Sequence, residues 1–362
     1  METITLAIPQ KTIHYPIFIG RDLIGKIGEL IDMNQRSSVG VITDKTISEL
    51  WLPRLRSGVG CEMKVTIVPS GENAKTVESV LQILDALQTA RFDRSSLLIT
   101  MGGGAIGDAA GFAASVYMRG LSYVYVPTTL LSQADASIGG KTGIDFGGVK
   151  NSVGAIHQPI AVVTDVETLA TLPDRELISG FAEVIKHGII ADAEYLAFVT
   201  SKKPREFSCD ELITVIKGSC EIKRSVVEKD EREKGARRLL NFGHTIGHAI
   251  EALSLETDTP LLHGEAIAIG MVEEARISER VGLLQKGGAA LVAEMLEKVE
   301  LPTAMPKFPR ERIMEKIESD KKSAGGKVGW TLLKRIGEAV AGVEVENLVK
   351  KPSIHICQTF SS

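Results

Sequence analysis

Hydrophobic positions in the first half of the chain fall into short apolar runs that are separated by polar or glycine-rich turns. Five of these runs are candidate strands: SVGVIT (38–43), KVTIV (64–68), SLLIT (96–100), YVYV (123–126) and AVVT (161–164). Helical patterns such as VESVLQILDALQTA (77–90) lie between them. Strands that alternate with helices favour a mostly parallel, doubly wound sheet. Ligands of such sheets bind beyond the carboxyl ends of the strands.

Long helical patterns dominate the second half of the chain. They are ELISGFAEVIKHGII (176–190), ELITVIKGSCEIKRSVVEK (211–229), LNFGHTIGHAIEAL (240–253) and HGEAIAIGMVEEARISERVGL (263–283). A chain of 362 residues is long enough for two domains. The pattern predicts an α/β domain over residues 1–168 and an all-α domain over residues 169–362, with the change near residues 165–175.

Composition excludes several classes of function. The formal net charge is −4, aromatic residues make up 5% of the chain, and no block rich in lysine or arginine occurs, so nothing indicates nucleic-acid binding. No apolar run of about 18 residues is present, which argues against a membrane span. The first residues lack the features of a signal peptide, and the four cysteines have no C-x-x-C spacing. We therefore expect a cytoplasmic protein with reduced thiols.

A glycine cluster follows the third strand. The segment SLLITMGGGAIGDAAGFAA satisfies G-x-G-x-x-G through Gly102, Gly104 and Gly107, between a strand and a helix. Glycines there let backbone N–H groups approach a pyrophosphate at the start of the helix. Asp108 is placed to cap that helix. The motif lies unusually late in the chain, so two interpretations stay open: a dinucleotide site or a tight structural turn.

Two further polar turns follow strands. VPSGENAKT (68–76) offers Ser70, Glu72 and Lys75, and alone it is an ordinary solvated loop. The segment 126–159 gathers Thr128, Thr129, Asp135, Lys141, Lys150 and Asn151 among glycines. Its GGKT tetrapeptide is not a P-loop, because Asp135 stands where that motif needs its first glycine.

The second half contains a cluster with metal-ligand character. His244 and His248 are four positions apart on one helix, away from its apolar face, and His263 begins the next helical pattern. A carboxylate could come from Glu183, which projects together with Lys186 off the apolar stripe of its helix. The alternatives are solvent-facing histidines and a surface Glu–Lys pair. Two imidazoles and a carboxylate would suit a catalytic zinc that polarises an alcohol beside a nicotinamide.

Long blocks of this sequence resemble the 3-dehydroquinate synthase family, and they run over nearly the whole chain. The blocks are MGGGAIGDAAGF, YMRG, VPTTLLSQADASIGGKTGID, GVKNSVGAIHQP, SGFAEVIKHGII, CEIKRSVVEKDEREKGARRLLNFGHTIGHAIE, HGEAIAIGM and DKK. The resemblance implies an NAD-binding α/β domain, a helical metal domain and a homodimer. It also implies conversion of 3-deoxy-D-arabino-heptulosonate 7-phosphate into 3-dehydroquinate and phosphate. NAD⁺ oxidises the C5 alcohol transiently, phosphate is eliminated, the hydride returns and an intramolecular aldol step closes the ring.

The resemblance also implies roles for individual residues. The metal, Zn or Co, would be held by Glu183, His244 and His263, so that His248 acts on the substrate. The substrate shell would comprise Lys141, Asn151, Lys186, Lys223, Arg237, Asn241 and one lysine of the pair Lys321 and Lys322. Arg119 would contact phosphate, with reach into a partner subunit, and Glu233 would order the cations. The NAD contacts would be Asp44, Ser70, Gly71, Glu72, Lys75, Gly103, Gly104, Ala105, Asp108, Thr128, Thr129, Asp135, Lys141, Lys150, Thr168 and Thr171.

Three rival functions remain. Other sugar-phosphate cyclases act on sedoheptulose 7-phosphate or glucose 6-phosphate, and they rank second because KNSVGAIHQP keeps the dehydroquinate-type residues. Metal-dependent polyol dehydrogenases would accumulate NADH and need no cationic shell for a doubly anionic substrate. A non-enzymatic binding module would hold nucleotide or metal without turnover.

Overall fold

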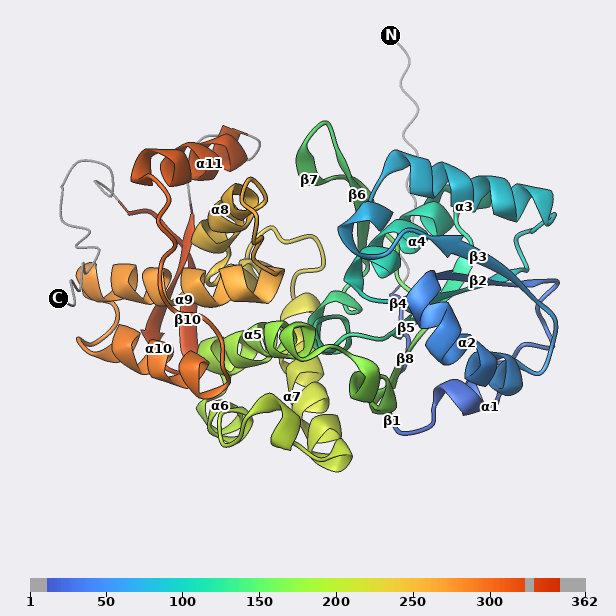
Figure 1. Ribbon diagram of the computed structural model, residues 1–362, viewed down its shortest axis with the longest axis horizontal. Helices are drawn as coiled ribbons and strands as arrows, with labels where there is room; N and C mark the ends of the chain where they lie inside the picture. The colour runs from blue at the N-terminus through green and yellow to red at the C-terminus, as the bar shows by residue number, and fades with distance from the viewer. Residues whose placement is uncertain (1–11, 323–328, 346–362) are drawn as a thin grey trace, which may run out of the picture. The chain divides into compact units, whose positions relative to one another are not determined.

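The computed structural model describes residues 12–322 and 329–345, and the chain forms two compact units (Figure 1). Unit 1 comprises residues 1–127 and 140–165, and unit 2 comprises residues 128–139 and 166–362. The division therefore differs from the simple split after residue 168. The short segment 128–139 groups with the helices of unit 2 because its π-helix, Ser132–Ala136, packs against helices of that unit.

Unit 1 is built on a six-stranded sheet in which all the pairings are parallel. Its strands are β1 (Ile17–Gly20), β2 (Val39–Asp44), β3 (Met63–Val68), β4 (Leu97–Gly102), β5 (Ser122–Pro127) and β8 (Ala161–Asp165), in the spatial order β1-β8-β5-β4-β2-β3. The parallel sheet predicted from the apolar runs is confirmed. The chain winds outward in both directions from β2 and β4, so the topological switch point lies between these two strands.

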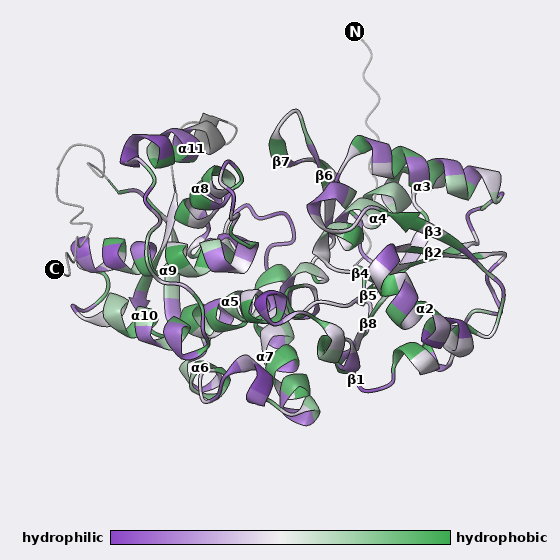
Figure 2. Ribbon diagram, in the orientation of Figure 1, coloured by the Kyte–Doolittle hydropathy of each residue, from purple (hydrophilic) through white to green (hydrophobic). Residues whose placement is uncertain are grey.

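Both faces of this sheet are covered, which explains why its strands are apolar throughout. On one face, residues of α3 (Val77–Thr89) and α4 (Gly104–Val116) pack on alternate strand positions such as Leu98 and Tyr125. On the other face, α1 (Ile27–Leu30) and α2 (Lys45–Val59) pack on the intervening positions, including Leu97 and Val124. Figure 2 shows hydrophobic and hydrophilic bands alternating along α2 and α3, as expected for helices that cover a sheet.

A hairpin in unit 1 was not foreseen from the sequence. Strands β6 (Lys141–Phe146) and β7 (Val149–Ile156) form an antiparallel pair with a turn at Gly147 and Gly148, both of which have positive φ. The glycines of this stretch predict a loop, and the structure corrects that prediction. Most residues of β7 are exposed, so the hairpin lacks the apolar alternation by which strands are recognised.

Unit 2 is predominantly helical, as predicted. Its helices are α5 (Asp174–Ala191), α6 (Ala193–Val199), α7 (Cys209–Val227), α8 (His244–Ser254), α9 (His263–Arg280), α10 (Gly288–Lys298) and α11 (Arg310–Lys322). A two-stranded antiparallel hairpin, β9 (Trp330–Arg335) and β10 (Glu338–Val343), adds to them. Residues of α8, α9 and β9 share one apolar cluster that includes Ile250, Ile269 and Trp330.

Glycines allow α8 and α9 to approach each other very closely. A Cβ atom on Gly270 of α9 would lie 2.0 Å from the carbonyl oxygen of Gly243, the residue before α8. A Cβ atom on Gly247 would lie 2.7 Å from the side chain of Ile267. The start of α9 is equally close to α5, because a Cβ on Gly264 would lie 1.9 Å from the carbonyl oxygen of Ser179. These contacts fix the helices that carry the candidate metal ligands.

Candidate functional site

The glycine motif occupies the turn from β4 to α4, next to the switch point of the sheet. Gly102 ends β4, Gly103 precedes α4 and Gly104 begins it. A Cβ on Gly107 would lie 2.3 Å from the hydroxyl of Tyr125, which donates a hydrogen bond to the carbonyl of Gly103 at 2.9 Å. The third glycine is thus required for packing of helix on strand, as in dinucleotide-binding folds. Backbone N–H groups at the start of a thirteen-residue helix also suit a pyrophosphate.

The other cofactor residues predicted for unit 1 also lie at or near strand ends. Asp44 is the last residue of β2 and caps α2 by accepting a hydrogen bond from the Ile47 N–H at 3.0 Å. Ser70, Gly71 and Glu72 are exposed in the turn after β3. The remaining predicted residues of this unit are Gly103, Gly104, Ala105 and Asp108 after β4, and Lys141 and Lys150 on the hairpin.

Lys75 connects two of these turns and the hairpin. Its ammonium donates to Asp108 at 2.9 Å and also to the side-chain oxygen of Asn151. The expectation that Asp108 caps α4 is therefore replaced by an ion pair, and α4 has no side-chain cap. Burial lowers the pKa of Lys75, but the carboxylates of Asp108, Glu72 and Asp145 together outweigh burial and raise the pKa above its ordinary value. A cationic Lys75 is suited to a phosphate-bearing ligand.

Arg119 lies on a strained turn after α4. Met118 and Arg119 both have positive φ, 50° and 65°, which costs free energy for residues with a side chain. The Arg119 side chain is exposed, as are those of Lys141 and Lys150. The structure therefore presents these three cations to solvent on unit 1.

The cofactor residues predicted for unit 2 surround its π-helix. Thr128 is buried, with a hydroxyl that has no hydrogen-bond partner, and Thr129 contacts the Ser132 hydroxyl at 2.9 Å. Thr168 accepts from the side-chain amide of Gln133, and the Thr171 hydroxyl donates to the carbonyl of Thr168. A π-helix is rare and often marks a functional site.

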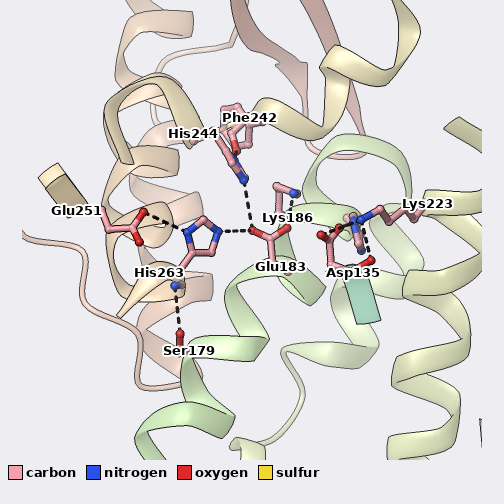
Figure 3. Close-up of polar contacts among 12 residues, drawn as sticks. Asp135, Ser179, Glu183, Lys186, Lys223, Phe242, His244, Glu251 and His263 are labelled. Atoms are coloured by element: carbon pink, nitrogen blue, oxygen red, sulfur yellow. Dashed lines mark hydrogen bonds and ion pairs between the residues drawn. The ribbon is translucent and has the colours of Figure 1, made fainter. Parts of the chain in front are cut away.

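Glu183, His244 and His263 converge in unit 2 from three helices (Figure 3). One carboxylate oxygen, Oε1 of Glu183, lies 3.6 Å from Nε2 of His244 and 3.7 Å from Nε2 of His263. The two distances exceed hydrogen-bond length, and Oε1 is buried without a hydrogen-bond partner. Ligands of a tetrahedral zinc with bonds of about 2.0–2.1 Å are separated by about 3.4 Å. The spacing of these three atoms therefore fits a divalent metal.

Both imidazoles are turned so that Nε2 faces the carboxylate. Nδ1 of His244 lies 3.2 Å from the carbonyl oxygen of Phe242, and Nδ1 of His263 lies 3.2 Å from the carboxylate of Glu251. A proton on each Nδ1 leaves the lone pair on each Nε2, which is the tautomer that a metal requires. Glu183, His244 and His263 therefore fit a divalent metal in their chemistry as well as in their spacing.

The interpretation of Glu183 and Lys186 as a surface pair is wrong. The two side chains are 1% and 2% exposed, and the Lys186 ammonium contacts Oε2 of Glu183. Burial raises the pKa of Glu183, but the charge of Lys186 together with the contacts of His263 and His244 outweighs burial and holds the pKa well below its ordinary value. Burial and the Lys186 charge together lower the pKa of His244 well below its ordinary value. The Glu183 carboxylate is therefore ionised and the His244 imidazole neutral. Burial lowers the pKa of His263, but the contacts with Glu183 and Glu251 outweigh burial and raise the pKa to about 9, so a metal would displace a proton from this imidazole.

A second polar cluster lies beside the first. Lys223 donates to the carboxylate of Asp135 at 2.8 Å and to its main-chain carbonyl at 2.7 Å. His187, fully buried, places Nε2 3.3 Å from that carboxylate. Donor atoms of Asp135, Glu183 and His187 lie within 4.8 Å of one another, so this group also has metal-ligand spacing. The ammonium groups of Lys186 and Lys223 already neutralise its two carboxylates.

Two residues of this region, His187 and Glu251, were not predicted from the sequence. His187 follows Lys186 directly and is four positions from Glu183, so its place on the same helical face was readable. Glu251 is three positions after His248 on α8, and only the tertiary fold brings it to His263.

Arg237, Asn241 and Glu233 lie together before α8. The Arg237 guanidinium is 3% exposed and donates to the carbonyl oxygens of Gly139 and Glu231. The side-chain amide of Asn241 donates to Glu233. The side chains of Lys321 and Lys322 lie outside the described residues, so their predicted role is untested.

His248 completes a group of three imidazoles but differs from the other two. Its side chain is exposed, and donor atoms of His244, His248 and His263 lie within 4.8 Å of one another. The ion-pair contacts of Glu183 run to His244 and His263. This arrangement is compatible with a split pair in which His248 faces the substrate.

Similar solved structures define the class of protein. A 2-epi-5-epi-valiolone synthase from Streptomyces hygroscopicus subsp. jinggangensis, with NAD⁺ and Zn²⁺ bound, is 27% identical, covers 94% of this chain and 96% of its own, and has a TM-score of 0.85. A 2-deoxy-scyllo-inosose synthase complexed with carbaglucose-6-phosphate, NAD⁺ and Co²⁺ is 25% identical, with coverage of 91% and 93% and a TM-score of 0.83. The fold is that of sugar-phosphate cyclases, and the groups bound in these relatives match the NAD and divalent metal expected from the sequence.

Family models make the assignment more specific. The N-terminal model of 3-dehydroquinate synthase matches residues 65–179, and the C-terminal model matches residues 180–323. The chain belongs to the 3-dehydroquinate synthase family.

More distant matches show the fold alone. A probable glycerol dehydrogenase from Sinorhizobium meliloti is 14% identical, covers 83% of this chain and 88% of its own, and has a TM-score of 0.63. In the described part of the chain, none of the helices has the length and apolarity needed to cross a membrane.

Proposed function

We propose that the protein is a 3-dehydroquinate synthase, which converts 3-deoxy-D-arabino-heptulosonate 7-phosphate into 3-dehydroquinate and phosphate. The buried guanidinium of Arg237 is the observation that carries this choice. This guanidinium donates to main-chain carbonyl oxygens, which are neutral, and the nearby Asp230 carboxylate accepts from three backbone N–H groups instead. A buried guanidinium in this setting calls for an anionic partner of its own. The substrate carboxylate supplies that partner in bidentate form.

The residues present fit both groups that this chemistry needs. Glu183, His244 and His263 would hold the metal, and the turns after β2, β3 and β4 would hold NAD. When bound, NAD and a divalent metal supply reversible oxidation of the C5 alcohol and polarisation of its oxygen.

The chain's own side chains perform the remaining tasks. The exposed imidazole of His248, one helical turn after His244, accepts the proton of the C5 hydroxyl. Lys186 and Lys223 each carry a buried charge that is balanced by one carboxylate, and they are placed to share it with a substrate anion. Glu233 orients Asn241 through its hydrogen bond.

One assay tests the proposal directly. The protein is loaded with Co²⁺ and incubated with the heptulosonate phosphate and NAD⁺, while phosphate release and absorbance at the NADH band are followed together. We expect one phosphate per substrate and no accumulation of NADH. Net NADH production from glycerol, with no phosphate release from the heptulosonate, would replace the proposal by a polyol dehydrogenase.

The carboxylate of the substrate separates this function from those of other cyclases. Sedoheptulose 7-phosphate and glucose 6-phosphate carry a phosphate but no carboxylate. We expect kcat/KM for the heptulosonate to exceed those for both sugars by about 10–150-fold, since a bidentate charged contact contributes about 1.5–3 kcal/mol. Arg237→Met should lose most of this preference, whereas Arg238→Met, at the neighbouring position, should keep it.

We further propose that the protein is a homodimer. The exposed, strained turn at Arg119 is then placed to reach the partner's substrate. Light scattering measures the assembly, and mixing Arg119→Ala subunits with subunits inactivated by His248→Ala tests whether the arginine acts across it.

A further inference from the structure

Each of the two histidines proposed as metal ligands is the first residue of its helix. His244 begins α8 and His263 begins α9. The position of a side chain at the start of a helix depends on how firmly that end of the helix is held. In both cases a carboxylate of the other helix fixes the position, and the two contacts run in opposite directions.

The first contact runs from α8 to α9. Glu251, three residues after His248, places its carboxylate 3.2 Å from Nδ1 of His263 (Figure 3). Glu251 is 7% exposed, so little solvent competes for this hydrogen bond. The contact keeps the proton on Nδ1 and aims Nε2 at Glu183.

The second contact runs from α9 to α8. Oε2 of Glu274 accepts a hydrogen bond from the N–H of Gly243 at 2.7 Å, and Oε1 accepts one from the N–H of Ile246 at 3.1 Å. These two N–H groups flank His244 at the start of α8 and have no partner within the helix. Burial raises the pKa of Glu274 to about 8, while its bonds to the backbone act in the opposite direction.

The sequence around Gly243 explains why a distant carboxylate is needed. Gly243 has φ of 83°, and a Cβ there would lie 2.5 Å from Met271 and 2.9 Å from the carbonyl oxygen of Ile267. The close approach of α9 therefore excludes the serine, threonine or aspartate that usually caps a helix. Glu274, one turn after Gly270 on α9, supplies the missing oxygens.

We propose that Glu251 and Glu274 form a reciprocal clamp that positions His263 and His244, respectively, for metal binding. Neither carboxylate belongs to the proposed ligand set, so both are positioning residues. The clamp makes α8 and α9 a single unit, in which displacement of either helix start moves one ligand away from Glu183. The inference rests on the proposed metal site.

The test measures Co²⁺ binding, which needs no substrate. Affinity is obtained by competition with a chelator, and the visible absorption of bound Co²⁺ reports ligand geometry. The wild-type protein is measured first: if it binds no Co²⁺, the proposed site itself fails. If it binds Co²⁺, the variants decide on the clamp alone.

Glu251→Leu should weaken Co²⁺ binding by about 10–100-fold and alter the absorption spectrum, because removal of such an outer partner has effects of that size. Glu251→Gln keeps an acceptor for Nδ1–H and should rescue most of the affinity. Glu256→Gln, in the turn after α8, is the matched control, because Glu256 pairs with Arg312 at the surface. Unchanged affinity and spectrum in Glu251→Leu would overturn this arm.

Glu274→Gln places an amide donor against one of the two backbone N–H groups, so it should also weaken Co²⁺ binding and shift the spectrum. Its control is Glu273→Gln, one residue earlier, whose carboxylate contacts Arg276 instead. Under the clamp, kcat falls with little change in KM in the Glu251 and Glu274 variants, because the substrate cations are untouched. If Glu274→Gln does not fold, the Glu251 variants still test the clamp. If the two carboxylates have a purely structural role, every folded variant should show the wild-type Co²⁺ spectrum.

Discussion

Gly270→Ala is the smallest change that tests how closely α8 must approach α9. The new Cβ would lie 2.0 Å from the carbonyl oxygen of Gly243 and 2.7 Å from the N–H nitrogen of Gly247. Ordinary contact begins near 3.4 Å, so the start of α8 must recede by about 1.4 Å. Because Glu274 lies one turn away on the same face, its 2.7 Å bond to Gly243 would be stretched beyond hydrogen-bond length.

The magnitude follows from three effects. Overpacking costs about 1–3 kcal/mol, and a buried N–H that loses its acceptor costs a further 1–3 kcal/mol, while alanine gains about 1 kcal/mol over glycine in a helix. The net loss in the free energy of unfolding should be about 1–5 kcal/mol. A displacement of this size at His244 should also weaken Co²⁺ binding at least about tenfold, by analogy with loss of an outer partner.

Tryptophan fluorescence can follow unit 2 separately. Trp330 lies in the cluster shared by α8 and α9, whereas Trp51 packs beneath the sheet of unit 1. In a Trp51→Phe background, urea unfolding monitored by fluorescence therefore reports on the helices concerned. Gly20→Ala is the control, because its Cβ would meet only Leu23 at ordinary distances of 3.5–3.6 Å. A Gly270→Ala variant within about 0.5 kcal/mol of its parent, with unchanged Co²⁺ affinity, would refute the reasoning.

Three further predictions concern the metal, the cofactor and pH. His244→Ala should lose both Co²⁺ in equilibrium dialysis and turnover, whereas His248→Ala should keep Co²⁺ and lose turnover; equal metal loss in both would make them a matched ligand pair. Gly107→Ala should weaken NAD binding about tenfold in calorimetry, because its Cβ would displace the Tyr125 hydroxyl, and an unchanged affinity would argue for a purely structural turn. The contacts of Glu211 with Lys202 and Ser208 lower its pKa to about 2, so the stability that it contributes is present above about pH 4.5 and is lost as pH falls to 2. Glu211→Gln should flatten acid unfolding in that range, and an unchanged slope would contradict the assignment.

The sheet of unit 1 could be predicted because the apolar run that marks each strand lies within a short stretch of sequence. Strands buried on both faces are apolar throughout, and the ends of the five predicted runs lie within two residues of the ends of β2, β3, β4, β5 and β8. The hairpin of β6 and β7 escaped prediction because its exposed strand and its glycine turn produce no apolar period.

The candidate site was harder to predict because the burial of α5 depends on how the helices pack in the fold and not on the sequence pattern of α5 itself. The helical wheel placed Glu183 and Lys186 off the apolar stripe, and on a surface helix they would be a weak pair. In the fold, α5 is buried over most of its circumference, from Ser179 to Ile190. No pattern within one helix reveals that its polar side also faces protein.

The spacing of His244 and His248 on one helix does not by itself identify the metal ligands. Four positions on a helix bring two imidazoles to one side, and their ring centroids are 5.1 Å apart. Yet the centroid of His263, from another helix, is only 5.6 Å from that of His244, so proximity does not select the ligands. The selection rests on Glu183: Lys186 occupies one carboxylate oxygen, and the other faces Nε2 of His244 and of His263. Each of these two imidazoles has an oxygen acceptor at Nδ1, which orients its Nε2 toward the metal position. A metal would therefore find two oriented imidazoles and the Glu183 carboxylate in place. This favours Glu183, His244 and His263 as the ligands over the pair His244 and His248.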